Sequence, residues 1–313
     1  MKILIAGAGT VGSAFGAFLR KSGHDVALLG REEHLEAIRR DGLAVSGIWG
    51  DHNVKGFSLF TRVSDITGPF DAVFICVKSF DTAKTAFEIK PLLAENTLLI
   101  SLQNGLGNVE AISAATGHPL ILGGRVIFGI ALTAPGKIKI TVYTEPVMIG
   151  FPRDLGRGVS PVAAERAKDL ARAIDAAGIP CRFTGKIEKY LWAKMLYNCA
   201  LNPLGALHRV HYGALMENPA WKARMDGIIR EIFSVAKVRG VPLLWERPED
   251  FLAVFYGKLV PDTYNHRSSM LQDIEKGRRT EIESMNGMIV KYGKEAGIPT
   301  PLNLEMVEGI KGL

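Results

Sequence analysis

The chain opens with KILIAGAGTVG, residues 2–12, and this stretch decides the fold class. An apolar run of strand length ends in glycines at positions 7, 9 and 12, and a helix is expected over 11–21. A GxGxxG pattern between a strand and a helix is typical of dinucleotide binding. The first glycine allows a tight turn, the second lets a pyrophosphate approach the backbone, and the third lets the helix pack closely on the strand.

The glycine loop therefore predicts a cofactor site at the amino terminus of a helix, which attracts an anion. The predicted contacts are Gly7, Ala8, Gly9, Thr10, Val11 and Gly12. The alternative, in which the glycines only form a tight turn, is disfavoured because strand, spacing and helix all agree with the dinucleotide interpretation.

The end of the second expected strand selects between the two nicotinamide dinucleotides. An acidic residue there holds the ribose hydroxyl of NAD, whereas an arginine accommodates the 2′-phosphate of NADP. Here the strand at 25–30 runs into Arg31, 19 residues after Gly12, and a guanidinium binds phosphate through paired hydrogen bonds. We therefore expect NADPH. The alternative is a solvated arginine beside Glu32 and Glu33, either of which would suit a ribose.

Apolar strand-like runs alternate with helical stretches through residues 1–185, the pattern of βαβ units in a doubly wound parallel sheet. Further helices are expected at 32–40 and 161–177, buried parallel strands at 71–77 and 97–102, and a last strand at 181–183. The strand-rich segment 119–150 has turns at Pro135-Gly136 and Glu145-Pro146, so we expect antiparallel strands added to that sheet.

After Gly185 only helical patterns remain. The expected helices are 187–201, 213–238, 248–258 and 280–295. The sequence therefore predicts an α/β fold with two domains: a Rossmann-type domain over residues 1–185 and an all-helical domain over residues 186–313.

Composition narrows the function class. The 313 residues are 47% hydrophobic and 22% charged, as in folded globular proteins. Three widely spaced cysteines without a Cys/His cluster argue against a disulfide framework and a metal site and favour a reducing compartment. The first apolar run is too short for a signal peptide or a membrane span, so we expect a cytoplasmic protein with no membrane partner.

Charge gives a weaker indication of the ligand. The formal net charge is +6, but basic and acidic residues are intermixed along the chain. A nucleic-acid surface would show clustered basic residues with interleaved aromatics, so we expect no nucleic-acid partner. A small anionic ligand fits the charge better.

Polar residues in apolar surroundings mark the candidate active site. Lys78 and Asn104 follow two of the expected parallel strands, where ligands bind in such sheets, although each is also consistent with a solvated lysine or a turn. Lys194, Asn198 and Asn202 are spaced by four in an otherwise apolar helix, so they share one face. Buried polar groups need partners, which a polar cleft, a ligand or a structural hydrogen-bond network would supply.

Near the carboxyl end, the stretch at 268–287 places Ser269 before a helix that carries Glu281. Thr280 is the expected cap of that helix. Glu281 is then either a functional carboxylate or an acidic residue that stabilises the helix amino terminus.

The sequence resembles that of the ketopantoate reductases (2-dehydropantoate 2-reductases), and the resemblance covers the chain from the first strand to the last helix. The landmarks are GAGTVG at 7–12, Arg31, CVK at 76–78, QNG at 103–105, KMLYNCALNPLGAL at 194–207 and SSMLQDIEKGRRTEIESMNG at 268–287. The resemblance implies NADPH-dependent reduction of 2-dehydropantoate to (R)-pantoate, on the way to pantothenate and coenzyme A. It also implies a helical domain like that of 6-phosphogluconate dehydrogenase, with no metal ion.

The resemblance further implies a role for each candidate residue. Lys194 resembles the general acid that protonates the ketone oxygen. Glu281 resembles a catalytic partner of the lysine and of the substrate hydroxyl, close to the cofactor. The implied substrate contacts are Asn198, Asn202, Ser269 and Asn104, and Lys78 and Asn104 are placed near the nicotinamide ribose.

One position departs from the family pattern. Some members carry a further substrate-binding asparagine 18 positions after the lysine, where this chain has Tyr212. Two alternatives therefore stay open: a reductase of a different 2-keto acid, and a noncatalytic NADPH-binding sensor. The retained polar residues argue against the sensor. The helical domain is also compatible with a homodimer.

Overall fold

The computed structural model describes residues 1–156 and 158–313. Contacts within it divide the chain into two compact units. Unit 1 comprises residues 1–103 and 108–187, and unit 2 comprises residues 104–107 and 188–313. The short segment 104–107 therefore belongs with the helical unit, although it follows a strand of the α/β unit.

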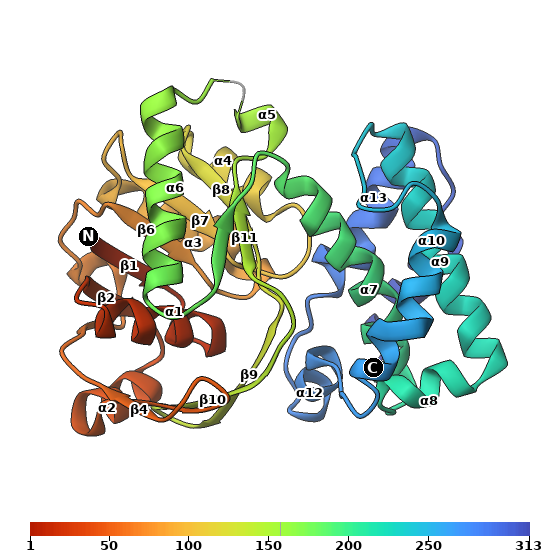
Figure 1. The fold of residues 1–313 in the computed structure, drawn as a ribbon, viewed down its shortest axis with the longest axis horizontal. Helices are drawn as coiled ribbons and strands as arrows, with labels where there is room; N and C mark the ends of the chain where they lie inside the picture. The colour runs from red at the N-terminus through yellow and green to blue at the C-terminus, as the bar shows by residue number, and fades with distance from the viewer. Residues whose placement is uncertain (157) are drawn as a thin grey trace. The chain divides into compact units, whose positions relative to one another are not determined.

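Unit 1 is built on an eight-stranded sheet in the order β12-β11-β8-β7-β6-β1-β2-β5 (Figure 1). Its strands are β1 (Lys2–Ala6), β2 (Asp25–Leu29), β5 (Ser58–Phe60), β6 (Ala72–Ile75), β7 (Leu98–Ser101), β8 (Ile121–Arg125), β11 (Val147–Gly150) and β12 (Cys181–Phe183). The six strands from β5 to β8 are parallel and follow the spatial order of a Rossmann sheet. The predicted α/β class and parallel sheet are confirmed.

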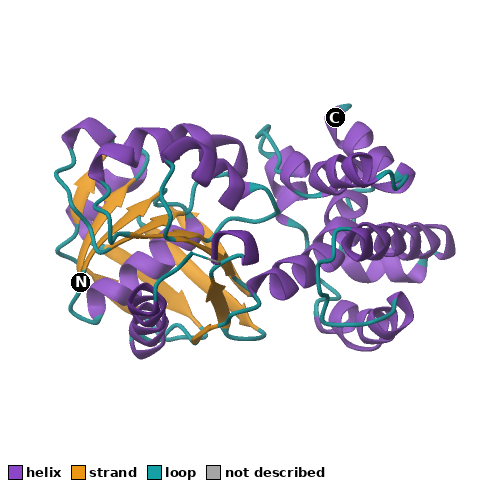
Figure 2. Cartoon of the chain, turned by 90° about the horizontal axis from the view of Figure 1, so that it is seen from above, coloured by secondary structure: helices purple, strands orange, loops and turns teal. Residues whose placement is uncertain are grey.

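Helices cover both faces of this sheet (Figure 2). They are α1 (Thr10–Lys21), α2 (Glu32–Asp41), α3 (Thr82–Ile89), α4 (Asn108–Thr116), α5 (Arg153–Gly156) and α6 (Pro161–Ala176). Side chains alternate along a strand, so Ile3 and Ile5 of β1 pack in the cluster that holds Phe15 of α1. Leu4 of β1 belongs to the opposite cluster with Ile112 of α4.

The expectation for residues 119–150 is partly wrong. β8 is parallel to β7, and only β11 adds to the main sheet in antiparallel orientation, beside β8. The remaining strands form a separate sheet in the order β4-β3-β10-β9. Its strands are β3 (Leu43–Gly47), β4 (His52–Val54), β9 (Phe128–Ala134) and β10 (Lys137–Tyr143). A Cβ at Gly47 would lie 2.0 Å from the Ile140 carbonyl oxygen, so this glycine permits the close pairing of β3 with β10.

Among the described residues of unit 2, all regular secondary structure is helical. They are α7 (Ile187–Leu207), α8 (Tyr212–Glu217), α9 (Pro219–Val238), α10 (Pro248–Val254), the π-helical turn η4 (Phe255–Leu259), α11 (Val260–Asp262), α12 (Ser269–Glu275), the 3₁₀ turn η5 (Ile282–Ser284), α13 (Asn286–Ala296) and α14 (Pro301–Lys311). No helix in the described part of the chain is long and apolar enough to cross a membrane.

The helices expected in unit 2 differ from the structure in their bounds, and two helices were not predicted. The helix expected over 213–238 is divided at Asn218 into α8 and α9. The helix expected over 280–295 is the turn η5 followed by α13, so Thr280 does not cap it. The sequence pattern did not indicate α12, which has 7 residues, or α14, which has 11. Helix α7 continues to Leu207 although Pro203 lies inside it.

The continuation of α7 through Pro203 has a local cause. Proline lacks an N–H, so the carbonyl of Cys199, four residues earlier, loses its usual helical donor. The buried amide of Asn286 replaces it, with its Nδ2 donating to the Cys199 carbonyl oxygen at 3.1 Å and to Asn303 Oδ1 at 3.0 Å. The first residue of α13 therefore satisfies the proline-containing turn of α7.

We expect Asn286→Ala to lower the free energy of unfolding by about 2 kcal/mol, because it leaves a buried carbonyl and a buried amide oxygen without donors. Denaturant unfolding followed by tryptophan fluorescence measures this change. The double variant with Pro203→Ala restores an N–H toward the Cys199 carbonyl and should recover part of the loss. No recovery would contradict this account of the turn.

Candidate active site

The glycine loop of unit 1 has the geometry of a pyrophosphate site. Gly7 has φ +108°, and a Cβ there would lie 2.6 Å from the Val77 nitrogen. A Cβ at Gly12 would lie 2.2 Å from the Gly7 carbonyl oxygen. A Cβ at Gly9, by contrast, would meet nothing within 4 Å. Two glycines are thus required by the protein's own packing, and the third leaves open space above its backbone.

The amino terminus of α1 faces this open space without a side-chain cap. Gly9 is the residue that precedes the helix, and no side chain hydrogen-bonds to the first turn. The loop is held by its own backbone, with the amides of Gly7 and Ala8 donating to the Leu29 carbonyl at 3.0 and 2.8 Å. An uncapped helix amino terminus beside a glycine with room above it fits a dinucleotide pyrophosphate.

Arg31 lies two residues after the end of β2, beside the glycine loop. A Cβ at Gly30 would lie 2.9 Å from the Ala8 Cβ, so the end of β2 touches the loop. Arg31 is exposed at the start of α2, and its guanidinium makes no hydrogen bond or ion pair with the residues that the structure describes. An arginine without a carboxylate partner at this position fits the 2′-phosphate of NADP.

Lys78 is half-buried at the end of the β6 segment, and a hydrogen-bond network fixes the neighbouring backbone. Gln103 Nε2 donates to the Val77 carbonyl at 2.9 Å and to Thr82 Oγ1 at 2.6 Å. Ser101 Oγ donates to Gln103 Oε1 at 3.1 Å. Gln103 and Thr82 were not predicted as site residues. The only signal in the sequence was the position of Gln103 at the end of a strand.

In unit 2, Lys194 and Asn104 meet directly. The ammonium of Lys194, half-buried on α7, donates to Asn104 Oδ1 at 2.6 Å. Asn104 belongs to the loop 104–107, which is anchored on the turn η5 because the Leu106 amide donates to the Ser284 carbonyl at 2.8 Å. Gly105 has φ +87°, and a Cβ there would lie 2.3 Å from the Ser284 carbonyl oxygen.

Glu281 immediately precedes the same turn. This residue is buried, and its carbonyl accepts hydrogen bonds from the Ser284 amide at 3.1 Å and from Ser284 Oγ at 3.0 Å. Ser284 therefore joins the Asn104 loop to the Glu281 turn. The sequence did not single out Ser284, since its role depends on a contact between segments far apart in the chain.

The two asparagines on the α7 stripe differ in their surroundings. Asn198 is 8% exposed, and its side-chain amide makes no hydrogen bond with the described residues. Asn202 is 4% exposed and is held by the Tyr212 hydroxyl, which donates to Oδ1 at 2.6 Å. A nearly buried amide without a protein partner, as at Asn198, is suited to a polar ligand.

The two serines that precede α12 also differ. Ser268 is fully buried, accepts a hydrogen bond from the Leu271 amide at 3.0 Å and donates to the Asn202 carbonyl at 3.3 Å. Ser269, the predicted substrate contact, is the exposed first residue of α12. Ser268 thus fixes the start of the helix and leaves Ser269 accessible.

Comparison with known proteins identifies the family. The model of "Ketopantoate reductase PanE/ApbA" matches residues 3–153, and that of its C-terminal part matches residues 186–313. The chain belongs to the ketopantoate reductase family. It is therefore an oxidoreductase of a family that uses a pyridine nucleotide.

Individual relatives agree with membership of the ketopantoate reductase family. A 2-dehydropantoate 2-reductase of Aquifex aeolicus is 42% identical over 99% of this chain and 96% of its own length. The crystal structure of a ketopantoate reductase from Ralstonia eutropha JMP134 has a TM-score of 0.87 at 31% identity, with 99% of this chain and 97% of that chain covered. A D-mandelate dehydrogenase, solved with NADH and anilino(oxo)acetate, has a TM-score of 0.88 at 28% identity and covers 100% of this chain and 98% of its own.

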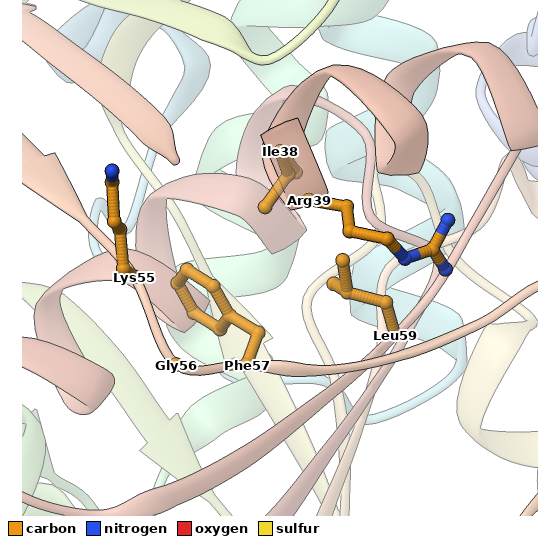
Figure 3. A pocket seen from close by; sticks show the side chains of 6 residues that line it. All are labelled: Ile38, Arg39, Lys55, Gly56, Phe57 and Leu59. Atoms are coloured by element: carbon orange, nitrogen blue, oxygen red, sulfur yellow. The ribbon is translucent and has the colours of Figure 1, made fainter. Parts of the chain in front are cut away.

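One cavity of unit 1 lies apart from the candidate cofactor and substrate residues described above. It measures about 200 Å³ and lies between the second half of α2 and the segment before β5. Figure 3 shows Lys55 and Arg39 on opposite sides of it, with Phe57 and Leu59 between them. Ile38 and Gly56 complete its lining. It includes none of the predicted cofactor or substrate residues.

Proposed function

We propose that the protein reduces 2-dehydropantoate to (R)-pantoate with NADPH, in the cytoplasmic synthesis of pantothenate and coenzyme A. The observation that carries the proposal is the Lys194 ammonium held at 2.6 Å from Asn104 Oδ1, on a helix face that also presents the unpartnered Asn198 amide. Family membership and the 42% identical 2-dehydropantoate 2-reductase support the choice of substrate.

Lys194 is the proposed proton donor. Bound NADPH supplies a hydride to the ketone carbon, and negative charge then develops on the ketone oxygen. An ammonium beside that oxygen stabilises the charge and transfers a proton to it. Asn104 accepts a hydrogen bond from Nζ, which helps to fix the position of the ammonium.

The remaining polar residues of unit 2 bind and orient the substrate in this proposal. The Asn198 amide supplies hydrogen bonds that no described protein group uses. Ser269 is accessible for the substrate carboxylate at the start of α12. Glu281 is the proposed partner of the substrate hydroxyl and of the lysine, and Asn202 is a further substrate contact.

Most of the proposed cofactor residues lie in unit 1, whereas Asn104 belongs to unit 2. The glycine loop and the uncapped amino terminus of α1 would hold the pyrophosphate, and Arg31 the 2′-phosphate. Lys78 and Asn104 would contact the nicotinamide ribose.

A second candidate is reduction of a different 2-keto acid. The similarity to a D-mandelate dehydrogenase supports it, since that enzyme was solved with a bulky aryl 2-keto acid analogue. In this chain Tyr212 motivates the second candidate, because it stands where some family members carry an asparagine.

A substrate and cofactor panel tests both candidates. Purified protein is assayed for consumption of NADPH or NADH with 2-dehydropantoate, pyruvate, 2-ketoisovalerate and phenylglyoxylate. A preference for 2-dehydropantoate with NADPH supports the leading proposal. A preference for phenylglyoxylate supports the second candidate, and reduction of none of them overturns both.

Arg31→Ala is expected to weaken NADPH binding by about 10- to 100-fold, because it removes a charge-assisted pair to the 2′-phosphate. NADH lacks this phosphate, so its affinity should change little. Titration of both cofactors by fluorescence measures the two constants. Arg39→Ala is the control, because Arg39 lies on α2, the helix that begins directly after Arg31, and pairs with Glu36. Equal losses for both cofactors would contradict the assignment.

A further inference from the structure

A buried tyrosine supports one of the proposed substrate contacts. Tyr212 is the first residue of α8 and is 2% exposed. Its ring packs edge-to-face on Tyr197 with 5.8 Å between the ring centres, and its hydroxyl lies 2.6 Å from Asn202 Oδ1. Burial raises the pKa of the Tyr212 phenol well above its usual value, so the hydroxyl stays protonated and donates.

The surroundings of Asn202 fix the orientation of its amide. The other side-chain contact is from Nδ2 to the Met285 sulfur at 3.7 Å. A thioether accepts hydrogen bonds weakly and donates none, so the amide oxygen is directed to the phenol and the NH₂ group to the sulfur. Asn202 therefore presents N–H groups whose single partner among the described residues is a weak acceptor.

The position of Asn202 on α7 indicates which substrate atom it meets. Asn202 follows Lys194 by eight residues on the same helix face, a rise of about 12 Å at 1.5 Å per residue. Asn202 is therefore placed to contact a substrate oxygen other than the ketone oxygen that Lys194 protonates. Since Ser269 is the proposed contact of the carboxylate, the substrate oxygen that remains for Asn202 is the hydroxyl.

We propose that Tyr212 is a positioning residue that holds the Asn202 amide as a hydrogen-bond donor to the hydroxyl oxygen of the substrate, remote from its keto acid end. This inference rests on the proposed function. Tyr212 acts through Asn202 and sets specificity for a hydroxylated 2-keto acid. It does not take part in hydride or proton transfer.

Tyr212→Phe tests this inference with two substrates that differ by one hydroxyl. With 2-dehydropantoate, KM should rise about 10-fold and kcat should change little, because one orienting hydrogen bond is lost. With 3,3-dimethyl-2-oxobutanoate, which lacks the hydroxyl, KM should stay the same. In an Asn202→Ala background, Tyr212→Phe should have no further effect, since the two residues act as one unit.

Tyr197→Phe is the matched control. Tyr197 is in the same aromatic cluster, and its hydroxyl forms an equally short bond of 2.6 Å to Thr263 Oγ1 with no link to Asn202. Thermal unfolding of both variants accounts for any loss of stability. Only Tyr212→Phe should alter KM.

The outcomes separate this inference from the proposed function. If the wild-type protein reduces 2-dehydropantoate and Tyr212→Phe leaves KM unchanged, the role of Tyr212 is overturned and the proposed function stands. Equal KM increases for both substrates, or for both tyrosine variants, also overturn it. Wild-type protein that does not reduce 2-dehydropantoate overturns the proposed function and this inference together.

Discussion

Lys194→Ala should lower kcat for 2-keto acid reduction about 1,000-fold, because the variant loses the proton donor and the positive charge beside the ketone oxygen. The affinity for NADPH should remain nearly the same, since the glycine loop and Arg31 belong to unit 1 and Lys194 belongs to unit 2. Steady-state turnover and a fluorescence titration of NADPH measure the two quantities separately.

Lys189→Ala is the control for this variant. Lys189 is on the same helix but lies five residues earlier, so its side chain points to another face. Its replacement should leave kcat within about twofold, as most surface substitutions have small effects. Turnover of Lys194→Ala close to that of the wild type would show that another group supplies the proton.

Asn104→Ala tests whether kcat depends on the position of the Lys194 ammonium and not only on its presence. Lys194 remains in this variant, but the acceptor at 2.6 Å is removed. We expect an intermediate loss of kcat, about 10-fold, because the ammonium loses one of the contacts that position it. A loss as large as that of Lys194→Ala would mean that Asn104 itself touches the reacting atoms.

Local sequence patterns predicted much of the fold and of the candidate site. The alternation of apolar runs and helices predicted the parallel sheet, because each strand and helix must bury its own apolar face. The spacing of Lys194, Asn198 and Asn202 predicted one polar helix face, which depends only on the 3.6-residue period. The open space at Gly9 agrees with the role expected from its place in the motif.

The features that were missed depend on contacts between distant segments. Asn202 is held by Tyr212, Ser268 and Met285, and the last of these is 83 residues away. The separate sheet of β9 and β10 likewise depends on pairing with β3, which no local pattern specifies. Helix α7 continues through Pro203 because of Asn286, a partner 87 residues from the carbonyl it satisfies. Periodicity within a window carries no information about such partners.

Gly9→Ala is expected to weaken NADPH binding about 100-fold, or roughly 2.7 kcal/mol, because a methyl group would fill the space that the pyrophosphate needs. The apo protein should keep its thermal stability, since the added Cβ meets nothing within 4 Å and φ is −87°, which alanine adopts readily. The thermal shift caused by NADPH measures binding, and the unfolding midpoint without cofactor measures stability.

Gly7→Ala is the contrasting variant. Its φ of +108° and the 2.6 Å approach of a Cβ to the Val77 nitrogen make alanine there unfavourable in the folded protein itself. This variant should therefore unfold at a lower temperature even without cofactor. If Gly9→Ala lost stability as Gly7→Ala does, the space above Gly9 would be needed for folding. If Gly9→Ala bound NADPH normally, the pyrophosphate would not approach the backbone at this glycine.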